Sequence, residues 1–402
     1  MRATDLIELE NKFGAHNYHP LPVVITKGKG VHLWDVDGKK YFDFLSAYSA
    51  VNQGHCHPKI IAELKKQASQ LTLTSRAFHN DKLGILEKKL NNLFGYDKSL
   101  IMNSGAEAVE TALKLARKWA YHVKNIKAEQ AKTIVCAGNF HGRTITIISA
   151  STSPDSRAGF GPYTPGFTVI PYDDIDSLKT ALNDPNVCAY LVEPIQGEAG
   201  VIVPQKNYLS EAAKLCKQNN VLFIADEIQT GLGRTGALLA CDHEKVRPDI
   251  LILGKALSGG VLPVSAVLCD DEIMLTIKPG EHGSTYGGNP LASAVAMAAL
   301  DVLLKEKMTD NAEKLGPFFR EGLKKIKSPF ITEIRGMGLL TGIDIAPSLG
   351  KTALGFCLDL MENGILAKPT REHTIRLAPP LTITKKELQY CLKIFERVFQ
   401  PV

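Results

Sequence analysis

The sequence lacks the long hydrophobic run that a membrane-spanning helix requires. No stretch of about 18 consecutive apolar residues occurs in the 402-residue chain. The N-terminal region already contains Asp5 and Glu8, and it has neither a long apolar core nor an Arg- and Ser-rich amphipathic run. We therefore expect no spanning helix, no membrane partner, and neither a signal nor a transit peptide.

Paired cysteine motifs are also missing. The eight cysteines are scattered along the chain, with no C-x-x-C pair and no spacing typical of a zinc site. This usage favours a reduced compartment, so we expect a cytoplasmic protein without disulfides and without a bound metal.

Charge of one sign is not concentrated anywhere. The 47 basic and 42 acidic residues are mixed along the chain and leave a formal net charge of only +5. A basic arm or stripe of the kind that binds nucleic acid is absent. We therefore expect small molecules, not nucleic acid, as partners.

The chain does have the length and the 45% hydrophobic content for a large core in two or three domains. Short apolar runs alternate with helical patterns, which predicts an α/β fold with a doubly wound, mostly parallel sheet. The expected strands are residues 99–102, 133–137, 167–170, 188–192, 221–226, 250–253 and 264–269, and helical patterns include residues 107–121, 208–218 and 290–304.

The rhythm of the pattern changes after residue 300. A helix, a short strand region at 331–345, another helix and the segment 374–377 indicate a smaller α+β unit. We expect a large domain at residues 46–300 and a C-terminal small domain at 301–402, joined by the N-terminal segment 1–45.

A charged residue ends each of two apolar strands. Asp226 closes the run 221–226, and Lys255 follows the run 250–253 after one glycine. Ligands of open α/β sheets bind beyond the carboxyl ends of strands, so both side chains are expected at one crevice. A lysine with apolar surroundings is disfavoured as an ammonium and can act as a nucleophile. A simple salt bridge between the two would fit the same pattern.

A candidate phosphate site follows the first strand of this set. Residues 103–108 open a helix, and Ser104 with Glu107 matches a capping box. The free amide groups of such a helix start can hold a phosphate. A well-capped helix without a ligand fits the segment equally well.

Two loops offer further contacts. Residues 139–143 place Phe140 and Arg143 directly after a strand, where a ring could stack on a planar cofactor. The hydroxyl pair Ser284 and Thr285 precedes a helix and could contact a phosphate. Either segment alone could be an ordinary loop.

Together these segments resemble the class III aminotransferases of fold type I. The resemblance covers nearly the whole chain, and within the family it is greatest to members that act on the δ-amino group of ornithine. The matching motifs are Ser104-Gly105-Ala106-Glu107, Asp226-Glu227-Ile228-Gln229, Gly254-Lys255-Ala256 and Gly283-Ser284-Thr285, with longer matches at residues 13–18, 46–55 and 192–200.

The resemblance implies a pyridoxal 5'-phosphate cofactor attached to Lys255, which also moves the substrate proton. Asp226 is implied to keep the pyridine nitrogen protonated. Phe140 would stack on the ring and Gln229 would bond the 3' oxygen. The implied cofactor-binding set is Ser104, Gly105, Ala106, Phe140, His141, Asp226, Gln229, Lys255, Ser284 and Thr285, the last reaching the site of the partner subunit in a homodimer.

The resemblance also implies the substrate contacts. Arg143 would pair with a carboxylate, and Tyr18 would bind the α-amino group of ornithine so that the δ-amine reaches the cofactor. Arg376 would bind the α-carboxylate of L-glutamate or 2-oxoglutarate, and Glu198 would neutralise it while ornithine is bound. Tyr48 would complete the pocket wall.

The implied reaction converts L-ornithine and 2-oxoglutarate into glutamate 5-semialdehyde and L-glutamate by ping-pong transfer. The semialdehyde should then cyclise to pyrroline-5-carboxylate without an enzyme, because the attack on its aldehyde is intramolecular.

Three other motifs are weaker. Residues 231–236 fit G-x-G-x-x-G, but the match begins away from a strand end and no helix follows, so a glycine-rich loop is the better interpretation. Residues 350–352 imitate the end of a P-loop whose first glycine is replaced by Ile345. Residues 55–58 contain three possible metal ligands, His55, Cys56 and His57, but no distant partners, which favours a turn.

Other functions stay open at this point. A nucleotide-dependent oxidoreductase or a non-catalytic scaffold would keep the fold, although Lys255 and Asp226 argue against a scaffold. Within the family, the alternatives are an acetylornithine, 4-aminobutyrate or lysine ε-aminotransferase. Tyr18 favours ornithine, because an acylated α-amine or 4-aminobutyrate gives the phenol no amine to bind.

Overall fold

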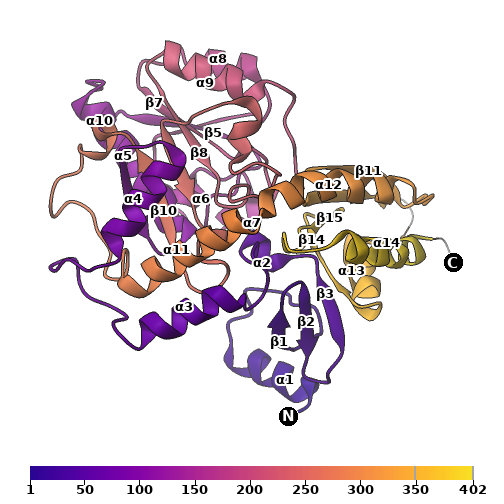
Figure 1. Ribbon diagram of the computed structural model, residues 1–402. Helices are drawn as coiled ribbons and strands as arrows, with labels where there is room; N and C mark the ends of the chain where they lie inside the picture. The colour runs from indigo at the N-terminus through magenta and orange to yellow at the C-terminus, as the bar shows by residue number, and fades with distance from the viewer. Residues whose placement is uncertain (348–349, 401–402) are drawn as a thin grey trace.

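A seven-stranded sheet occupies the centre of the larger part of the molecule (Figure 1). The computed structural model describes residues 1–347 and 350–400. In spatial order the strands are β4 (Lys98–Met102), β10 (Ser265–Cys269), β9 (Ile250–Leu253), β8 (Leu222–Asp226), β7 (Val187–Val192), β5 (Lys132–Cys136) and β6 (Phe167–Ile170). All seven predicted strands are present.

The predicted mostly parallel character of this sheet is confirmed from β9 to β6, whereas β10 runs antiparallel to both β4 and β9. Parallel neighbours need a long crossover, usually a helix. Residues 254–264 hold only the short helix η2 (Lys255–Ser258), so β10 turns back beside β9.

Helices cover both faces of this sheet. Along β8, Leu222 and Ile224 pack on the side of α5, whereas Phe223 and Ala225 pack on the side of α9. This alternation follows from the two-residue period of a strand and buries both faces. The helices of this region are α3 (Pro58–Ala68), α4 (Leu83–Phe94), α5 (Gly105–His122), α6 (Ile145–Ser149), α7 (Pro154–Arg157), α8 (Ile175–Ala181), α9 (Tyr208–Gln218), η1 (Ala240–Glu244), α10 (Asp271–Met274) and α11 (Pro290–Lys305).

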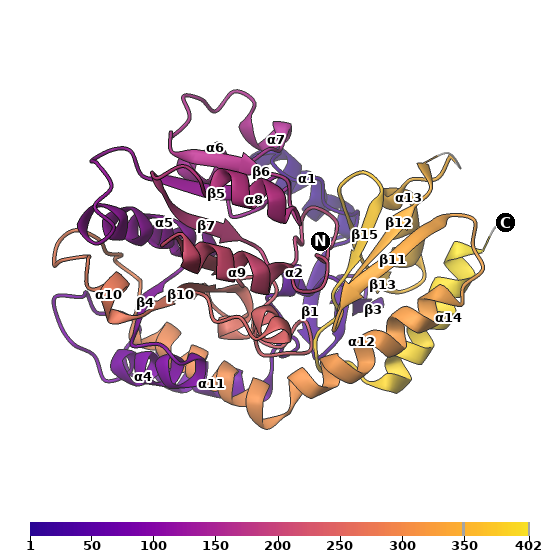
Figure 2. The same cartoon turned by 90° about the horizontal axis from the view of Figure 1, so that it is seen from above.

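The C-terminal part forms a separate antiparallel sheet with helices packed on it (Figure 2). The expected strand region at 331–345 is a hairpin of two strands joined at Met337 and Leu340. The elements are α12 (Met308–Lys324), β11 (Ile331–Met337), β12 (Leu340–Ile345), α13 (Ala353–Glu362), β14 (Lys368–Thr370), β15 (Thr374–Leu377) and α14 (Lys385–Phe399). Residues 348, 349, 401 and 402 of the predicted C-terminal unit lie outside the described part.

The N-terminal segment pairs with the C-terminal part through a third sheet. Strand β13 (Ile365–Leu366) lies parallel to β3, with Ile365 opposite Phe42. The N-terminal elements are α1 (Ala3–Phe13), β1 (Ile25–Lys29), β2 (His32–Asp35), β3 (Lys40–Asp43) and the single turn α2 (Ser46–Ser49). Within residues 1–347 and 350–400, no helix combines the length and apolar character needed to cross a bilayer.

Candidate active site

A cavity of about 190 Å³ lies beyond the carboxyl ends of β8 and β9. Parallel strands place their last residues at one edge of the sheet, which brings Asp226 and Lys255 together there. The cavity is lined by Gly105, Ala106, Phe140, His141, Gly142, Glu193, Ile195, Asp226, Ile228, Gln229, Thr230 and Lys255. Seven of the residues predicted from the sequence are therefore assembled in one place.

Lys255 opens the short helix η2 with a left-handed backbone, at φ 43°. Loss of hydration in the cavity lowers the pKa of its amine to about 8, and the positive charge of Arg376 acts in the same direction. The carboxylates of Glu198 and Asp226 oppose this shift. The amine is therefore much easier to deprotonate near neutral pH than an ordinary lysine.

Asp226 is buried, with 4% of its surface exposed. Its Oδ2 accepts a hydrogen bond from His141 Nδ1 at 2.7 Å, and its Oδ1 accepts one from the Ile228 amide at 3.1 Å. Burial alone would lower the pKa of His141, but the hydrogen bond and charge of Asp226 raise it. The Nε2 atom of His141 has no hydrogen-bond partner among the described residues. The Asp226 carboxylate in the cavity wall is therefore held in position by its hydrogen bond to the His141 imidazole.

The N-terminus of α5 forms another wall of the cavity. The Ser104 hydroxyl accepts from the Glu107 amide at 3.2 Å, and Glu107 Oε2 accepts from the Ser104 amide at 2.6 Å. The predicted capping box is thus confirmed. The amides of Gly105 and Ala106 precede the first intrahelical bond, so they can bind an anion. A Cβ at Gly105 would lie 3.0 Å from Ile228 Cδ1, so a larger residue at this position would crowd Ile228 and narrow the cavity.

Phe140 and Arg143 lie on the loop after β5. The Phe140 amide donates to Glu193 Oε2 at 2.9 Å, which fixes the loop against β7. Arg143 lies over the Phe140 ring at 5.3 Å and donates to the Ser156 hydroxyl at 2.8 Å. Arg143 does not line the cavity that holds Lys255, although the resemblance implied that it binds a substrate carboxylate there.

Arg376 on β15 connects the C-terminal sheet to the cavity. It is 2% exposed, and its guanidinium donates to Glu198 Oε1 at 2.6 Å and to Gln229 Oε1 at 3.1 Å. Burial alone would raise the pKa of Glu198, but the positive charges of Arg376 and Lys255 hold it below its usual value. Glu198 and Arg376 therefore form a charged pair beside the lysine.

Two tyrosines lie on the outer side of this pair. The Arg376 guanidinium is 5.2 Å from the Tyr48 ring centre, and burial together with the charge of Glu198 raises the pKa of Tyr48. Tyr18 is 67% exposed, and its ring centre is 5.8 Å from Lys368 Nζ. Tyr48 is half-buried against Arg376, whereas Tyr18 lies at the surface.

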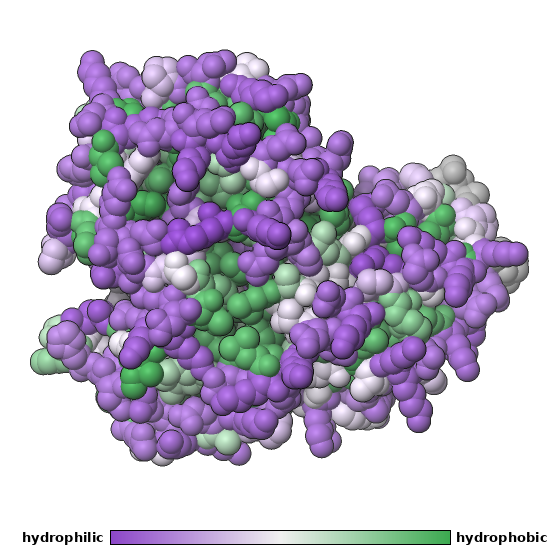
Figure 3. Space-filling view, turned by 45° about the horizontal axis from the view of Figure 1, so that its top comes forward, coloured by the Kyte–Doolittle hydropathy of each residue, from purple (hydrophilic) through white to green (hydrophobic). Residues whose placement is uncertain are grey.

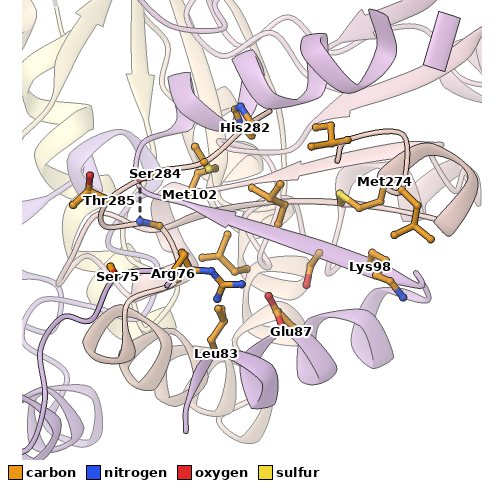
Figure 4. A pocket seen from close by; sticks show the side chains of 18 residues that line it. Ser75, Arg76, Leu83, Glu87, Lys98, Met102, Met274, His282, Ser284 and Thr285 are labelled. Atoms are coloured by element: carbon orange, nitrogen blue, oxygen red, sulfur yellow. Dashed lines mark hydrogen bonds between the residues drawn. The ribbon is translucent and has the colours of Figure 1, made fainter. Parts of the chain in front are cut away.

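Ser284 and Thr285 do not line the cavity that holds Lys255. They lie in a separate groove of about 770 Å³, together with Ser75, Arg76 and Glu87 (Figure 4). Ser284 accepts a hydrogen bond from Asn103 Nδ2 at 2.9 Å, next to the start of α5, and Thr285 is exposed. Within one chain, the predicted hydroxyl pair thus lies outside the Lys255 cavity, with Ser284 close to the start of α5 and Thr285 exposed to solvent.

Sequence reasoning overlooked Glu193 as a site residue. It is buried in the cavity wall next to His141, and burial raises its pKa to about 7. The signal was available, because Glu193 follows the apolar strand β7 in the same way that Asp226 ends β8. The contact of Ile228 with both Asp226 and the start of α5 had no comparable signal.

The weaker motifs have structural explanations. Residues 231–236 form turns, and Arg234 within them is fully buried and donates to the carbonyls of Leu339 and Pro379. In the segment 55–58, His55 contacts Asp43 and His57 contacts Glu306, so the two rings have different partners.

The P-loop imitation is also accounted for. Thr352 caps α13 through the amide of Gly355, and Lys351 pairs with Asp359. Both side chains are therefore engaged in local structure.

The residues of the cavity fit a phosphorylated cofactor with an aldehyde and a ring nitrogen. An amine of lowered pKa suits covalent attachment, a buried carboxylate suits a protonated nitrogen, and a helix N-terminus suits a phosphate. His141, another residue of the cavity wall, has a buried Nε2 without a hydrogen-bond partner among the described residues. The chemistry of the wall therefore agrees with pyridoxal phosphate.

Comparison with known proteins identifies the family of this chain and its structural relatives. Residues 13–399 match the model of the family described as aminotransferase class III. The chain is 58% identical to the mitochondrial ornithine aminotransferase of Rattus norvegicus over 392 residues, which is 98% of this chain and 89% of the relative.

Solved structures show the same architecture. The ornithine aminotransferase of Toxoplasma gondii ME49 matches with a TM-score of 0.98 at 51% identity, over 99% of this chain and 95% of that one. Another structure of the Toxoplasma gondii enzyme has partial occupancy of PLP at its active site. The acetylornithine aminotransferase of Elizabethkingia anophelis matches with a TM-score of 0.91 at 57% identity, over 99% of both chains.

Proposed function

The chain belongs to the class III aminotransferase family, and from this premise we propose that it transfers the δ-amino group of L-ornithine to 2-oxoglutarate. The products are glutamate 5-semialdehyde and L-glutamate. Pyridoxal phosphate, when bound, withdraws electrons from the substrate carbon whose C–H bond breaks. The observation that carries this proposal is the Glu198–Arg376 pair beside Lys255, which would let one site accept both an amine and a keto acid. The choice of ornithine among the amines rests on Tyr18.

Lys255 is proposed to hold the cofactor covalently and to carry the substrate proton. Its lowered pKa, about 8, leaves an appreciable fraction of neutral amine at neutral pH. A general base works best when its pKa lies near the operating pH. The neutral amine of Lys255 would accept the proton that the substrate carbon loses.

The remaining cofactor contacts are proposed from their place in the wall. Asp226, supported by His141, would bind the pyridine nitrogen, and Phe140 would stack on the ring. Gln229 would bond the 3' oxygen. The phosphate would be held by Ser104, Gly105 and Ala106, and by Ser284 and Thr285 of a second subunit.

The substrate site is proposed around Arg376. With ornithine bound, Glu198 would neutralise Arg376, as it does in the structure at 2.6 Å. With 2-oxoglutarate bound, the guanidinium would instead pair with the α-carboxylate of that acid. Arg143 would bind a second carboxylate, and Tyr48 would close the wall. One pocket could then accept two substrates by exchanging a single ion pair.

Tyr18 is proposed to bind the α-amino group of ornithine. Its exposed phenol lies near Lys368, on the outer side of Tyr48. The semialdehyde released from such a site still carries its free α-amine. Intramolecular attack then gives the five-membered imine pyrroline-5-carboxylate without further catalysis.

Acetylornithine is the second candidate substrate, because an acetylornithine aminotransferase is 57% identical over almost the full length. Tyr18 separates the two, since an acylated amine offers no ammonium to the phenol. We predict that Tyr18→Ile lowers kcat/KM for ornithine by about 10-fold or more, while 4-aminobutyrate is used almost as before. Equal losses for both amines would remove Tyr18 as the basis of the assignment.

A homodimer is proposed on two observations. Thr285 lies in a groove apart from the cavity of its own chain, and large hydrophobic side chains are exposed on segments that line or adjoin this groove. They are Leu71, Phe78, Ile85 and Tyr286. Figure 3 also shows hydrophobic side chains gathered in a hollow across one face. A partner that covers such surface would complete both phosphate sites.

Location and domain division are likewise proposals. The scattered cysteines, seven of them buried, support a cytoplasmic protein, although the rat relative is mitochondrial by name. We propose a large domain at 46–300 and a small domain of 1–45 with 301–402. The pairing of β3 with β13 supports the union of the two terminal segments.

The near-ultraviolet and visible spectrum tests the proposed function. The protein reconstituted with pyridoxal phosphate is expected to show an absorbance band that L-ornithine bleaches without any keto acid. The same additions of N-acetylornithine and 4-aminobutyrate serve as controls. If only another amine bleaches the band, that amine and not ornithine is the substrate. If no band appears after addition of pyridoxal phosphate, the proposed role of Lys255 is wrong.

A further inference from the structure

Tyr48 lies on a turn whose backbone is strained. Four consecutive residues, none of them glycine, have left-handed φ values: Ser46 at 48°, Ala47 at 45°, Tyr48 at 62° and Ser49 at 72°. L-residues avoid this conformation because Cβ crowds the following carbonyl, and runs of it are rare. Such a turn persists only where the surrounding structure holds it in place, and it is typical of functional sites.

The turn is held from its N-terminal side by Asp43. One carboxylate oxygen, Oδ1, accepts from the amides of Leu45 and Ser46, each at 2.8 Å. The other, Oδ2, accepts from His55 Nε2 at 2.7 Å. Asp43 is buried, so these bonds are shielded from water. The carboxylate therefore joins the start of the turn to the loop that follows it.

The side chains of the turn do not hold it themselves. The buried hydroxyls of Ser46 and Ser49 make no hydrogen bond to any residue in the described part of the chain. Inside the turn, the Ser46 carbonyl accepts from the amides of Ala50 and Val51 at 2.8 and 3.1 Å. Side-chain support at the entrance of the turn thus comes from Asp43, and through it from His55.

The flanking chain joins the turn to both halves of the candidate site. The Phe44 carbonyl accepts from the Ala378 amide at 2.7 Å, two residues beyond Arg376. After the turn, Gln53 Nε2 donates to the Ala256 carbonyl at 3.0 Å, next to Lys255. A shift of this segment would therefore move Tyr48 relative to both the guanidinium and the amine.

We propose that Asp43 and His55 are positioning residues, which hold the left-handed turn so that the Tyr48 ring closes the substrate pocket against Arg376. This inference rests on the proposed function, since it takes Tyr48 as a pocket wall. Asp43, His55 and Tyr48 all lie outside the lining of the Lys255 cavity, and of the three it is Tyr48 whose ring lies over the Arg376 guanidinium, at 5.2 Å. Asp43 and His55 would therefore act on the substrate pocket through Tyr48. Their contribution should appear in substrate binding and not in the attachment of the cofactor.

A double-mutant cycle tests whether Asp43 acts through Tyr48. Asp43→Ala is expected to raise the KM for the amine donor about 10-fold while kcat changes less than about threefold. In the Tyr48→Ala background the same change should leave KM nearly unaltered, because the residue on which it acts is gone. Multiplicative effects of the two substitutions would overturn the proposal.

Asp35→Ala is the matched control. Asp35 is also buried in the N-terminal sheet and accepts from Tyr41 Oη at 2.7 Å and the Lys39 amide at 2.8 Å, without contact to the turn. Asp35→Ala should leave KM unchanged although it lowers the stability of the protein about as much as Asp43→Ala does. A KM increase equal to that of Asp43→Ala would show a general structural effect and overturn the proposal.

Hydrogen exchange supplies a readout that does not depend on turnover. The amides of Leu45 and Ser46 should exchange faster in Asp43→Ala than in Asp35→Ala. Equal exchange rates in the two variants would contradict the role of Asp43 in holding the turn. If Asp43→Ala does not fold, His55→Gln carries the same cycle with a smaller increase in KM. The cycle uses whichever amine bleaches the cofactor band, so failure of ornithine as substrate would leave the test of the turn intact.

Discussion

Lys255 combines the two properties that a cofactor-binding lysine needs: a place at the end of a buried strand and a lowered pKa. An amine with a pKa of about 8 is roughly one-tenth neutral at pH 7, whereas an ordinary lysine is almost fully charged there. Only the neutral amine attacks an aldehyde. Burial in the cavity thus prepares the residue before any ligand arrives.

The rate of covalent attachment should therefore depend on pH in a defined direction. With the apoprotein, we predict that attachment of pyridoxal phosphate accelerates as pH rises through about 8, the pKa of Lys255, and then levels off. Stopped-flow absorbance would measure it. Glu198→Gln should move the midpoint to lower pH, because it removes a carboxylate that raises this pKa. A midpoint near that of free lysine would contradict the argument.

Glu198 should matter for one substrate and not for the other. We predict that Glu198→Gln raises the KM for ornithine by about 10-fold, because Arg376 keeps its uncompensated charge, while the KM for the keto acid stays unchanged or falls. The two half-reactions are measured separately. Glu333→Gln, which removes the exposed partner of Arg335, is the control. Unchanged ornithine kinetics in Glu198→Gln would contradict the proposed exchange of ion pairs at Arg376.

At the scale of elements, the start of α5 is proposed to have two roles: its capping box stabilises the helix, and its free amides bind the cofactor phosphate. The same capping box occurs at the start of α14, where Thr384 and Glu387 exchange hydrogen bonds far from the cavity. Both boxes have the same spacing, with a Ser or Thr three residues before a Glu. Only their surroundings separate a helix start that faces a cavity from one that does not.

Ser104→Ala and Thr384→Ala should therefore differ in one property. Each is expected to cost about 1 kcal/mol of stability through loss of the cap, as urea unfolding of the apoprotein would show. Only Ser104→Ala should also weaken binding of pyridoxal phosphate, by about 10-fold if one phosphate contact is lost. Equal cofactor affinity in both variants would place the phosphate elsewhere.

At the scale of the whole molecule, the separation of Thr285 from Lys255 makes a prediction about subunits. Lys255→Ala and Thr285→Ala are each expected to impair the enzyme alone. In a mixed dimer, one of the two sites would combine an intact Lys255 with an intact Thr285 from the other chain. Co-expression should then restore about a quarter of wild-type activity, because half of the dimers are mixed and each has one intact site.

Size-exclusion chromatography with light scattering provides the matching measurement of mass. A dimer without complementation would show that Thr285 does not reach the partner site. A monomer with full activity would contradict both the dimer and the shared phosphate site.

Much of the architecture was predictable from sequence because it follows from local periodicity. Short apolar runs, many of them continuous, predicted all seven strands of the large sheet, and the Ser104–Glu107 spacing predicted the start of α5. The direction of β10 was not predictable in this way, since it depends on how residues 254–264 fold. The hairpin at 331–345 was likewise seen only as one strand region.

The sequence by itself determined the α/β pattern, the acidic and basic residues at strand ends and the motifs that resemble class III aminotransferases, because these are properties of neighbouring residues. The tertiary structure alone decided which distant residues meet. It brings Glu198 to Arg376 across 178 positions, leaves Arg143 and Thr285 outside the cavity, and bends residues 46–49 into a left-handed turn. Such features depend on long-range hydrogen bonds and burial, which overcome local backbone preference only in the folded chain.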